Sequence, residues 1–189
     1  MSLGVTDLKK GTIFQLESVP YKVVEYSQKV MGRGGSIVNV RIKSLLDGKV
    51  LDRTFKGNEQ LDGADVTNKA VQYLYNDGGK FHFMDQTTYE QFELSADVVG
   101  DQAGYMKEGD SVQAQIFNGQ ATGIELPKNV PLKVAYTESA VKGDTSSSIT
   151  KDAKLETGVV IKVPAFIKTG DVISVDTATG AYRSRVKDS

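Results

Sequence analysis

The stretch "QKVMGRGGSIVNVRIKSLLDGKVLDRTF", residues 28–55, determines how the N-terminal third of this chain folds. Within "IVNVRIK" the apolar Val38, Val40 and Ile42 alternate with polar residues, which is the period of a half-buried β-strand. Just before this strand, a single cation, Arg33, stands among three glycines. The stretch therefore predicts a β-hairpin whose end is a bare, glycine-rich loop carrying one positive charge.

Working outward, several runs rich in β-branched and aromatic residues surround this hairpin. Pro20, the glycine-rich loop and the Asp47-Gly48 pair separate them, so strands are predicted over 12–16, 21–30, 36–43 and 50–55. Short strands at this density favour a small SH3-like barrel spanning residues 1–65. The polar stretch "GNEQLDGADVTN" that follows is interpreted as a linker.

The loop 31–35 has two interpretations. If the flanking runs pair, about seven residues of each strand could carry the tip roughly 20 Å beyond the barrel. Glycine permits positive φ and close approach to another surface, and the guanidinium of Arg33 suits phosphates and base edges. The alternative is a solvated turn whose arginine only maintains solubility, and the residues alone favour this second interpretation.

The remainder of the chain contains an internal repeat. Residues 107–126, "KEGDSVQAQIFNGQATGIEL", align without a gap on residues 168–187, "KTGDVISVDTATGAYRSRVK", at an offset of 61. In each copy a Gly-Asp pair opens an alternating strand and a later glycine lies in a hairpin turn. One unit used twice predicts two similar five-stranded OB barrels, residues 66–128 and 129–189.

Two further segments complete this prediction of structure. Residues 94–105 are the best candidate for a short helix. The polar run 141–158 is predicted to be a long loop, of the kind that binds partners or is disordered. The aromatic residues between 73 and 92 fit either a barrel core or a base-stacking platform, and the core is preferred because few cations lie near them.

The composition excludes several functional classes. The chain of 189 residues has no cysteine, so disulfides and thiol catalysis are excluded, and one histidine, His82, leaves no His-pair metal site. The sequence contains no Walker loop and no convergent set of titratable groups. It therefore gives no indication of an enzyme site, a metal site or a cofactor. Without an apolar leader or membrane span, a cytoplasmic protein is expected. The net charge of −1 combines two mildly basic ends with an acidic middle, residues 66–127.

Three long segments together resemble one known family. They are "GRGGSIVNVRIKSLLDGKVLDRTF", "QYLYNDGGKFHFMDQTTYEQ" and, near the C-terminus, "KGDTSSS" with "LETGVVIKVPAFIKTGDVISVDTATGAYRSRVK". In this order they resemble bacterial elongation factor P over essentially the whole chain. The resemblance implies an all-β fold with a KOW/SH3-like barrel and two OB barrels in an L-shaped, tRNA-like arrangement.

The resemblance also implies a function and the residues that perform it. Members bind the ribosome between the P and E sites, position the CCA end of the peptidyl-tRNA, and relieve stalling at consecutive prolines. Implied partners are the ribosome, P-site peptidyl-tRNA, ribosomal RNA and mRNA at the E site, and an enzyme that modifies Arg33; a monomer is expected. The implied site residues are Met31, Gly32, Arg33 and Gly34 at the tip, Gly143, Asp144 and Thr145 at the E-site codon and small subunit, and Tyr182 and Arg185 at the P-site tRNA.

At the tip the sequence departs from the family pattern. Many members have Pro-Gly-Lys-Gly, whereas this chain has Met-Gly-Arg-Gly at 31–34. Arginine excludes the β-lysine-type extension of lysine members, and rhamnosylated members usually have Asn where Gly34 stands here. Whether Arg33 is modified stays open. Two other functions also stay open: an elongation-factor-P-like paralogue with a different ribosomal role, and a general single-stranded RNA-binding OB protein.

Overall fold

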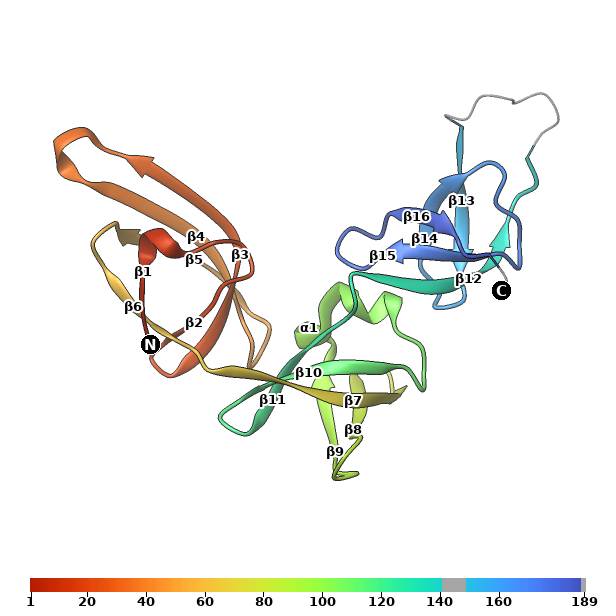
Figure 1. Ribbon diagram of the computed structural model, residues 1–189, viewed down its shortest axis with the longest axis horizontal. Coiled ribbons are helices and arrows are strands. Elements are labelled where there is room, and N and C mark those ends of the chain that lie inside the picture. Colours follow the sequence, from red (N-terminus) through yellow and green to blue (C-terminus); the bar gives the residue numbers. More distant parts are fainter. Residues whose placement is uncertain (141–148, 188–189) are drawn as a thin grey trace. The chain divides into compact units, whose positions relative to one another are not determined.

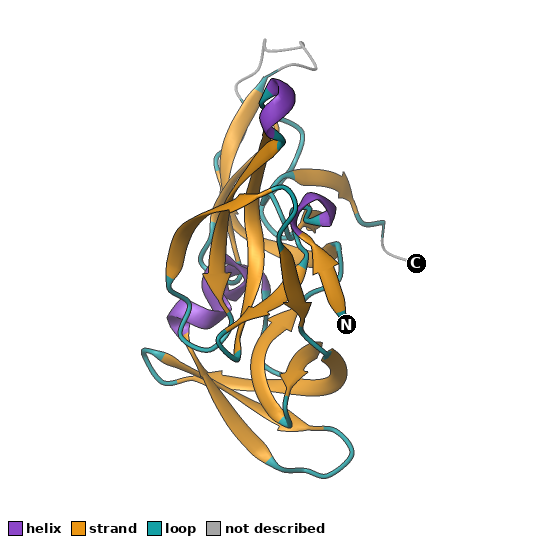
Figure 2. Ribbon diagram, turned by 90° about the vertical axis from the view of Figure 1, so that its left-hand side faces the viewer, coloured by secondary structure: helices purple, strands orange, loops and turns teal. Residues whose placement is uncertain are grey.

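The computed structural model describes residues 1–140 and 149–187, and nearly all of its regular structure is β-strand (Figure 1). Helix is confined to a few short turns, coloured purple in Figure 2. The described strands form three antiparallel sheets, which confirms the predicted succession of three β units. By their mutual contacts the residues divide into two units, 1–100 with 113–125 and 101–112 with 126–189.

The first sheet contains six strands in the order β1-β6-β2-β3-β4-β5. The buried side chains of its core include Val5, Phe14, Val38 and Ile42, each less than 2% exposed. As the alternation predicted, Val38, Val40 and Ile42 all face this core. The strands are β1 (Ser2–Gly4), β2 (Ile13–Leu16), β3 (Val19–Val30), β4 (Ser36–Ser44), β5 (Val50–Lys56) and β6 (Gln60–Gly63), with the 3₁₀ turns η1 (Val5–Asp7) and η2 (Gly32–Gly34).

One prediction for this region is wrong. The polar stretch 57–68 is not a linker, because it contains β6, which pairs with both β1 and β2, and the start of β7. Leu61 is the only buried residue of β6, at 7% exposure, and its polar neighbours face outward. A four-residue strand with one apolar side chain gives almost no periodic signal, which explains the error.

The second sheet has the strand order β11-β10-β7-β8-β9. The helix predicted over 94–105 is present in shortened form, as α1 and the 3₁₀ turn η3. Ser95 caps α1 by accepting a hydrogen bond from the Val98 amide, at 3.4 Å. No helix in the described residues has the length and apolar character needed to cross a membrane. The elements are β7 (Val66–Asn76), β8 (Lys80–Asp85), β9 (Gln91–Ser95), α1 (Ala96–Val99), η3 (Gly100–Tyr105), β10 (Ser111–Phe117) and β11 (Gln120–Glu125).

The aromatic residues of this sheet divide between two environments. Tyr73, Phe81 and Phe83 are buried, as the preferred core interpretation requires. Tyr75 and Tyr89, in contrast, are 45% and 71% exposed, so the prediction of a core does not hold for them.

The third sheet has the order β14-β13-β12-β15-β16. Its core includes Leu132, Val134, Ile167 and Ile173. The prediction of a loop over 141–158 is wrong in its second half, because β13 lies there. Only Ala153 and Leu155 of β13 are buried, and the other residues of the strand are polar, so the sequence shows little sign of a strand. The strands are β12 (Asn129–Thr137), β13 (Thr150–Leu155), β14 (Val160–Pro164), β15 (Val172–Asp176) and β16 (Tyr182–Arg185).

The second and third sheets have one topology. If the five strands of each are numbered along the chain, both sheets have the order 3-2-1-4-5, which is that of an OB barrel. The repeat aligns β10 and β11 with β15 and β16, and the local geometry confirms it. The amide of Lys107 donates to the Asp110 carboxylate at 2.8 Å, and the amide of Lys168 donates to that of Asp171 at 2.9 Å.

Candidate functional site

The hairpin of β3 and β4 ends in a compact loop of residues 31–35, called here the Arg33 tip (Figure 1). The Met31 amide donates to the Gly35 carbonyl at 2.8 Å, and the Gly34 amide donates to the Met31 carbonyl at 2.7 Å. Gly32 and Gly35 have φ of +35° and +89°, a conformation that side-chain-bearing residues rarely adopt. The glycines therefore close the hairpin in a tight turn around Arg33.

Within residues 1–140 and 149–187, no hydrogen bond or ion pair joins the Arg33 tip to a residue outside its own hairpin. All five of its residues are exposed, and Val30, just before it, is 80% exposed. A Cβ atom added to Gly32, Gly34 or Gly35 would meet no other atom within 4 Å. Among the described residues, none pairs with the Arg33 guanidinium, so all five of its N–H donors are available to a partner.

Beneath the tip, the hairpin is anchored in the first sheet by a third strand. β5 pairs with β4 as far as Ile37 opposite Lys56, and the Gly57 amide then donates to the Ser36 carbonyl at 2.7 Å. Phe55 of β5 is 8% exposed and packs in the core. The hairpin is thus not a free two-stranded arm over its predicted seven residues, because β5 supports one side almost to the loop. Strand pairing on both sides of β4 therefore continues to Ser36, directly after the Arg33 tip.

A second group of predicted site residues lies on β16. Tyr182 is half-buried against the core of the third sheet, whereas Arg185 is exposed. Both residues pair with β15, Arg185 opposite Ile173 and Tyr182 opposite Val175, with a bulge between the two pairs. On β16, therefore, Arg185 is accessible to a partner, and Tyr182 is accessible only in part. Arg33 belongs to the other unit of the chain.

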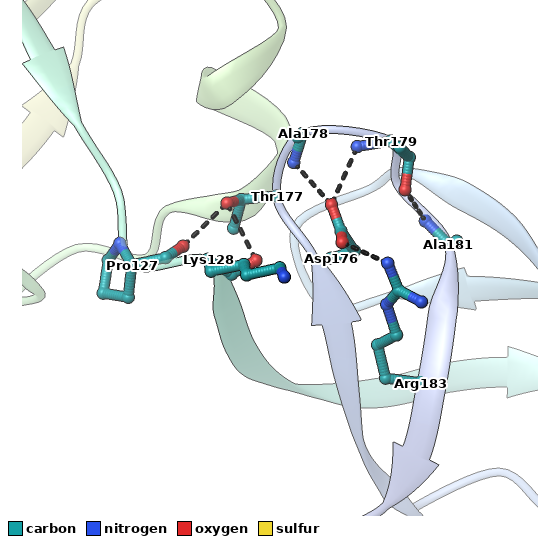
Figure 3. Close-up of polar contacts among 8 residues, drawn as sticks. All are labelled: Pro127, Lys128, Asp176, Thr177, Ala178, Thr179, Ala181 and Arg183. Atoms are coloured by element: carbon teal, nitrogen blue, oxygen red, sulfur yellow. Dashed lines mark hydrogen bonds and ion pairs between the residues drawn. The ribbon is translucent and has the colours of Figure 1, made fainter.

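The turn that leads into β16, residues 176–181, is called here the Asp176 turn (Figure 3). The Asp176 carboxylate accepts hydrogen bonds from the amides of Ala178 and Thr179, at 2.9 and 3.1 Å. It also accepts from the Arg183 guanidinium at 2.5 Å, although Asp176 is only 3% exposed. A buried carboxylate thus holds both the turn and the strand between Tyr182 and Arg185.

The Asp176 turn is also tied to the chain that enters the third sheet. The Thr177 hydroxyl donates to the carbonyls of Pro127 and Lys128, at 2.7 and 3.1 Å (Figure 3). The Arg183 hydrogen bond, followed by the two amide bonds, lowers the pKa of Asp176 from 3.8 to about 2. The carboxylate is therefore ionised throughout the neutral and mildly acidic range.

Other predicted site residues have different outcomes. Gly143, Asp144 and Thr145 lie outside the residues that the structure describes. Arg183 and Asp176 were missed by the sequence reasoning, although "DTATG" at 176–180 has the Asp-x-x-Thr-Gly pattern of a turn in which a carboxylate binds amides two and three residues on. Nothing in the sequence indicates that Arg183 pairs with Asp176, because that contact depends on the β15–β16 register.

Comparison with protein families covers most of the chain. Residues 4–61 match the model described as the elongation factor P KOW-like domain, and residues 66–124 match the elongation factor P OB domain. Residues 130–185 match the elongation factor P C-terminal model. The three matches follow the three sheets in order.

Individual relatives are similar over their full length. The chain is 42% identical to elongation factor P of Helicobacter hepaticus over 99% of this chain and 100% of that protein. It is 44% identical to elongation factor P of Coprothermobacter proteolyticus over 97% and 99%. Among solved structures, initiation factor 5A from Methanococcus jannaschii shares the fold over 66% of this chain and 92% of its own, with a TM-score of 0.51 at 21% identity.

Proposed function

This chain belongs to the elongation factor P family, and we propose that it binds the ribosome between the P and E sites and stimulates peptide-bond formation at consecutive prolines. In this proposal the Arg33 tip contacts the CCA end of the peptidyl-tRNA. The observation that carries the proposal is the unpartnered guanidinium at the end of a braced hairpin. A structural arginine would instead be paired or packed.

The chemistry of the tip suits an RNA terminus. A guanidinium is a planar fork of donors that stays charged at all physiological pH values and binds phosphate and base edges in two-pronged fashion. Exposed glycines on both sides of Arg33 let the backbone approach a nucleotide without steric hindrance from side chains. In this proposal Arg33 binds the RNA terminus, and Gly32 and Gly34 leave room for the nucleotide to approach the backbone.

The rate effect is proposed to arise from positioning. Holding two reactants in a reactive arrangement can remove on the order of 7 kcal/mol or more from a barrier by avoiding lost translational and rotational entropy. A factor that holds the tRNA end in place needs no acid, base or nucleophile of its own. Proline is a poor partner in peptide-bond formation, so its reactions gain most from such help.

Other surfaces would hold the factor on the ribosome. We propose that Tyr182 and Arg185 contact the P-site tRNA, and that Gly143, Asp144 and Thr145 contact the E-site codon and the small subunit. The factor would act as a cytoplasmic monomer. Arg33 is also a possible substrate for a modifying enzyme, and intact-protein mass spectrometry of material from the native host would reveal any added group.

The test is the Arg33→Ala variant in a deletion strain that carries a reporter with consecutive prolines. We expect reporter synthesis to fall at least about tenfold relative to the parent, a change of about 1.4 kcal/mol in the barrier. Arg53→Ala is the matched control, because Arg53 is an exposed arginine on β5 of the same sheet. Equal rescue by the Arg33→Ala variant and the parent would refute the assigned role of the tip.

A further inference from the structure

Each of the two OB barrels has a tyrosine directly after a β-bulge on its first strand. Tyr75 of β7 and Tyr136 of β12 are 61 residues apart, the offset of the internal repeat. Each follows a register shift in its strand, between Tyr73 and Tyr75 in one barrel and between Val134 and Tyr136 in the other. Each therefore points to the outer face of its sheet at an equivalent place, and the surroundings of the two rings can be compared directly.

In the second sheet, another side chain already covers the tyrosine ring. The ring of His82, opposite Tyr75 in the register, stacks on it at 4.4 Å with 16° between the planes. His82 in turn has its Nε2 atom 2.9 Å from the carboxylate of Asp77, and Glu93 lies opposite His82 on β9. Glu93 is itself paired with Lys80 at 2.5 Å, so the stacked histidine, held by Asp77, is what closes this face of Tyr75 to another ring.

In the third sheet the equivalent ring is open. Tyr136 is 61% exposed, and no described aromatic ring stacks on it. The residue opposite it is Lys154, and Lys154 in turn lies opposite Val160. These three residues line a surface hollow of about 410 Å³, together with Lys151 and Lys162. A volume of this size lies within the range of small-ligand sites.

The charges around the hollow favour an anion. Among the described residues, none pairs with the Lys154 ammonium group. Lys162 pairs with Asp152 at 2.8 Å, but both side chains are more than 60% exposed and water screens such a pair strongly. Lys151 donates to the backbone carbonyl of Glu138, which leaves its charge uncancelled by that contact. Three lysines therefore face two carboxylates, Asp152 and Glu138, around an open aromatic ring.

From this contrast we propose that the outer face of β12, β13 and β14 binds single-stranded RNA, with one base stacked on Tyr136 and its phosphate beside Lys154. The inference rests on the proposed ribosomal function, in which single-stranded ribosomal RNA or mRNA would supply the ligand. OB barrels bind oligonucleotides on the face of their second and third strands, which here are β13 and β14. An exposed ring beside a lysine that has no partner among the described residues, here Lys154, is an arrangement by which such faces stack bases without reading sequence.

The test uses the full chain and a fluorescein-labelled octauridine, with binding measured by anisotropy at about 50 mM salt, where phosphate contacts are strong. The Tyr136→Ala variant should weaken binding at least about fivefold, because a base–aromatic stack is lost. The matched control is Tyr75→Ala, which removes the equivalent ring of the other barrel and should bind as the parent does. Tyr136→Phe should retain binding within about twofold, because phenylalanine also stacks.

Reversing the charge of Lys154 tests the proposed phosphate contact independently of the aromatic ring. Lys154→Glu should weaken octauridine binding and reduce the slope of log K against log salt by about one to two, because a phosphate contact is replaced by repulsion. Three results would overturn the inference: no binding by the parent, unchanged binding by Tyr136→Ala, or equal losses in the Tyr136→Ala and Tyr75→Ala variants. A partner protein at this face would give the first of these.

The two proposals fail separately. The Arg33→Ala variant is judged by the proline reporter, and the Tyr136→Ala and Tyr75→Ala variants are judged by octauridine binding. If Arg33→Ala kept reporter activity, the assigned role of the tip would fall, and the contrast between Tyr136→Ala and Tyr75→Ala would still decide the RNA surface. If Tyr136→Ala bound normally, only the RNA surface would fall.

Discussion

The Arg33 tip and the Asp176 turn are both ends of β-hairpins, and each has glycine and an arginine at or beside it. Arg33 has no partner among the described residues, and the glycines around it face open space. Arg183, two residues after the Asp176 turn, donates to a carboxylate that is 3% exposed, and a Cβ atom at Gly180 would overlap the Tyr105 hydroxyl. The first arginine is left available for a partner, whereas the second is used to hold the protein's own strand.

In this protein, an arginine that is free to bind a partner differs from one that stabilises the fold in its tertiary contacts. Both arginines stand close to a glycine in the sequence: Arg33 lies in the loop "MGRGG", and Arg183 lies on β16, at the end of the stretch "TGAYR". Only the tertiary environment distinguishes them, because the carboxylate that binds Arg183 is seven residues away across a turn. Loss of Arg33 should therefore affect function alone, and loss of Arg183 should affect stability first.

The largest expected effect on stability comes from Arg183→Ala. This change leaves the Asp176 carboxylate buried without its cation, so the melting temperature should fall by at least about 4 °C. Arg33→Ala removes an exposed side chain and should shift it by less than about 2 °C. Thermal unfolding monitored by circular dichroism measures the melting temperatures of both variants. Equal shifts would show that Arg183 contributes no more to stability than Arg33 does.

A smaller effect is the acid dependence of the Asp176–Arg183 pair. The folded-state pKa of Asp176 is about 2 and its ordinary value is 3.8, so the stabilisation is present above about pH 4 and is lost as the pH falls toward 2. At pH 7 the parent should melt above the Asp176→Asn variant, and this gap should close near pH 2. A gap that stayed constant from pH 7 to pH 2 would show that the charge of Asp176 contributes nothing.

The smallest effect is expected from glycine substitutions in the two hairpin ends. Gly180 has φ of +73° and lies against Tyr105, so Gly180→Ala should lower the melting temperature by about 2 °C. Gly34 has open space around it and no positive φ, so Gly34→Ala should leave the melting temperature unchanged. If Gly34→Ala destabilised the protein as much as Gly180→Ala, the Arg33 tip would be packed rather than free.

The sequence predicted the parts of the fold that leave a periodic or turn signal. Alternation at Val38, Val40 and Ile42 located β4, and the 61-residue repeat located the paired strands of both OB barrels. β6 and β13 were missed because each buries only one or two apolar side chains. A short, mostly polar strand owes its place to the strands that pair with it on both sides, and no local pattern carries that information.

For the candidate site, the sequence located the Arg33 tip but not its support. The Gly-Arg-Gly loop and its flanking strands were enough to predict an exposed hairpin end. The pairing of β5 along β4, the Asp176–Arg183 contact and the open ring of Tyr136 all depend on strand register. The repeat was recognised only over 107–126 and 168–187, so the equivalence of Tyr75 and Tyr136, and the difference between the stacked ring and the open one, come from the structure.

The most direct measurement of the central claim is directed hydroxyl-radical probing from the Arg33 tip. The chain has no cysteine, so Val30→Cys, which keeps Arg33, provides a unique thiol for a tethered iron chelate. Ser18→Cys is the control, because Ser18 precedes the other end of β3, up to about 40 Å away along an extended strand. On ribosomes with peptidyl-tRNA, the probe at position 30 should cleave near the tRNA 3′ end and the probe at position 18 should not. Cleavage elsewhere from position 30, or the same pattern from both, would contradict the account.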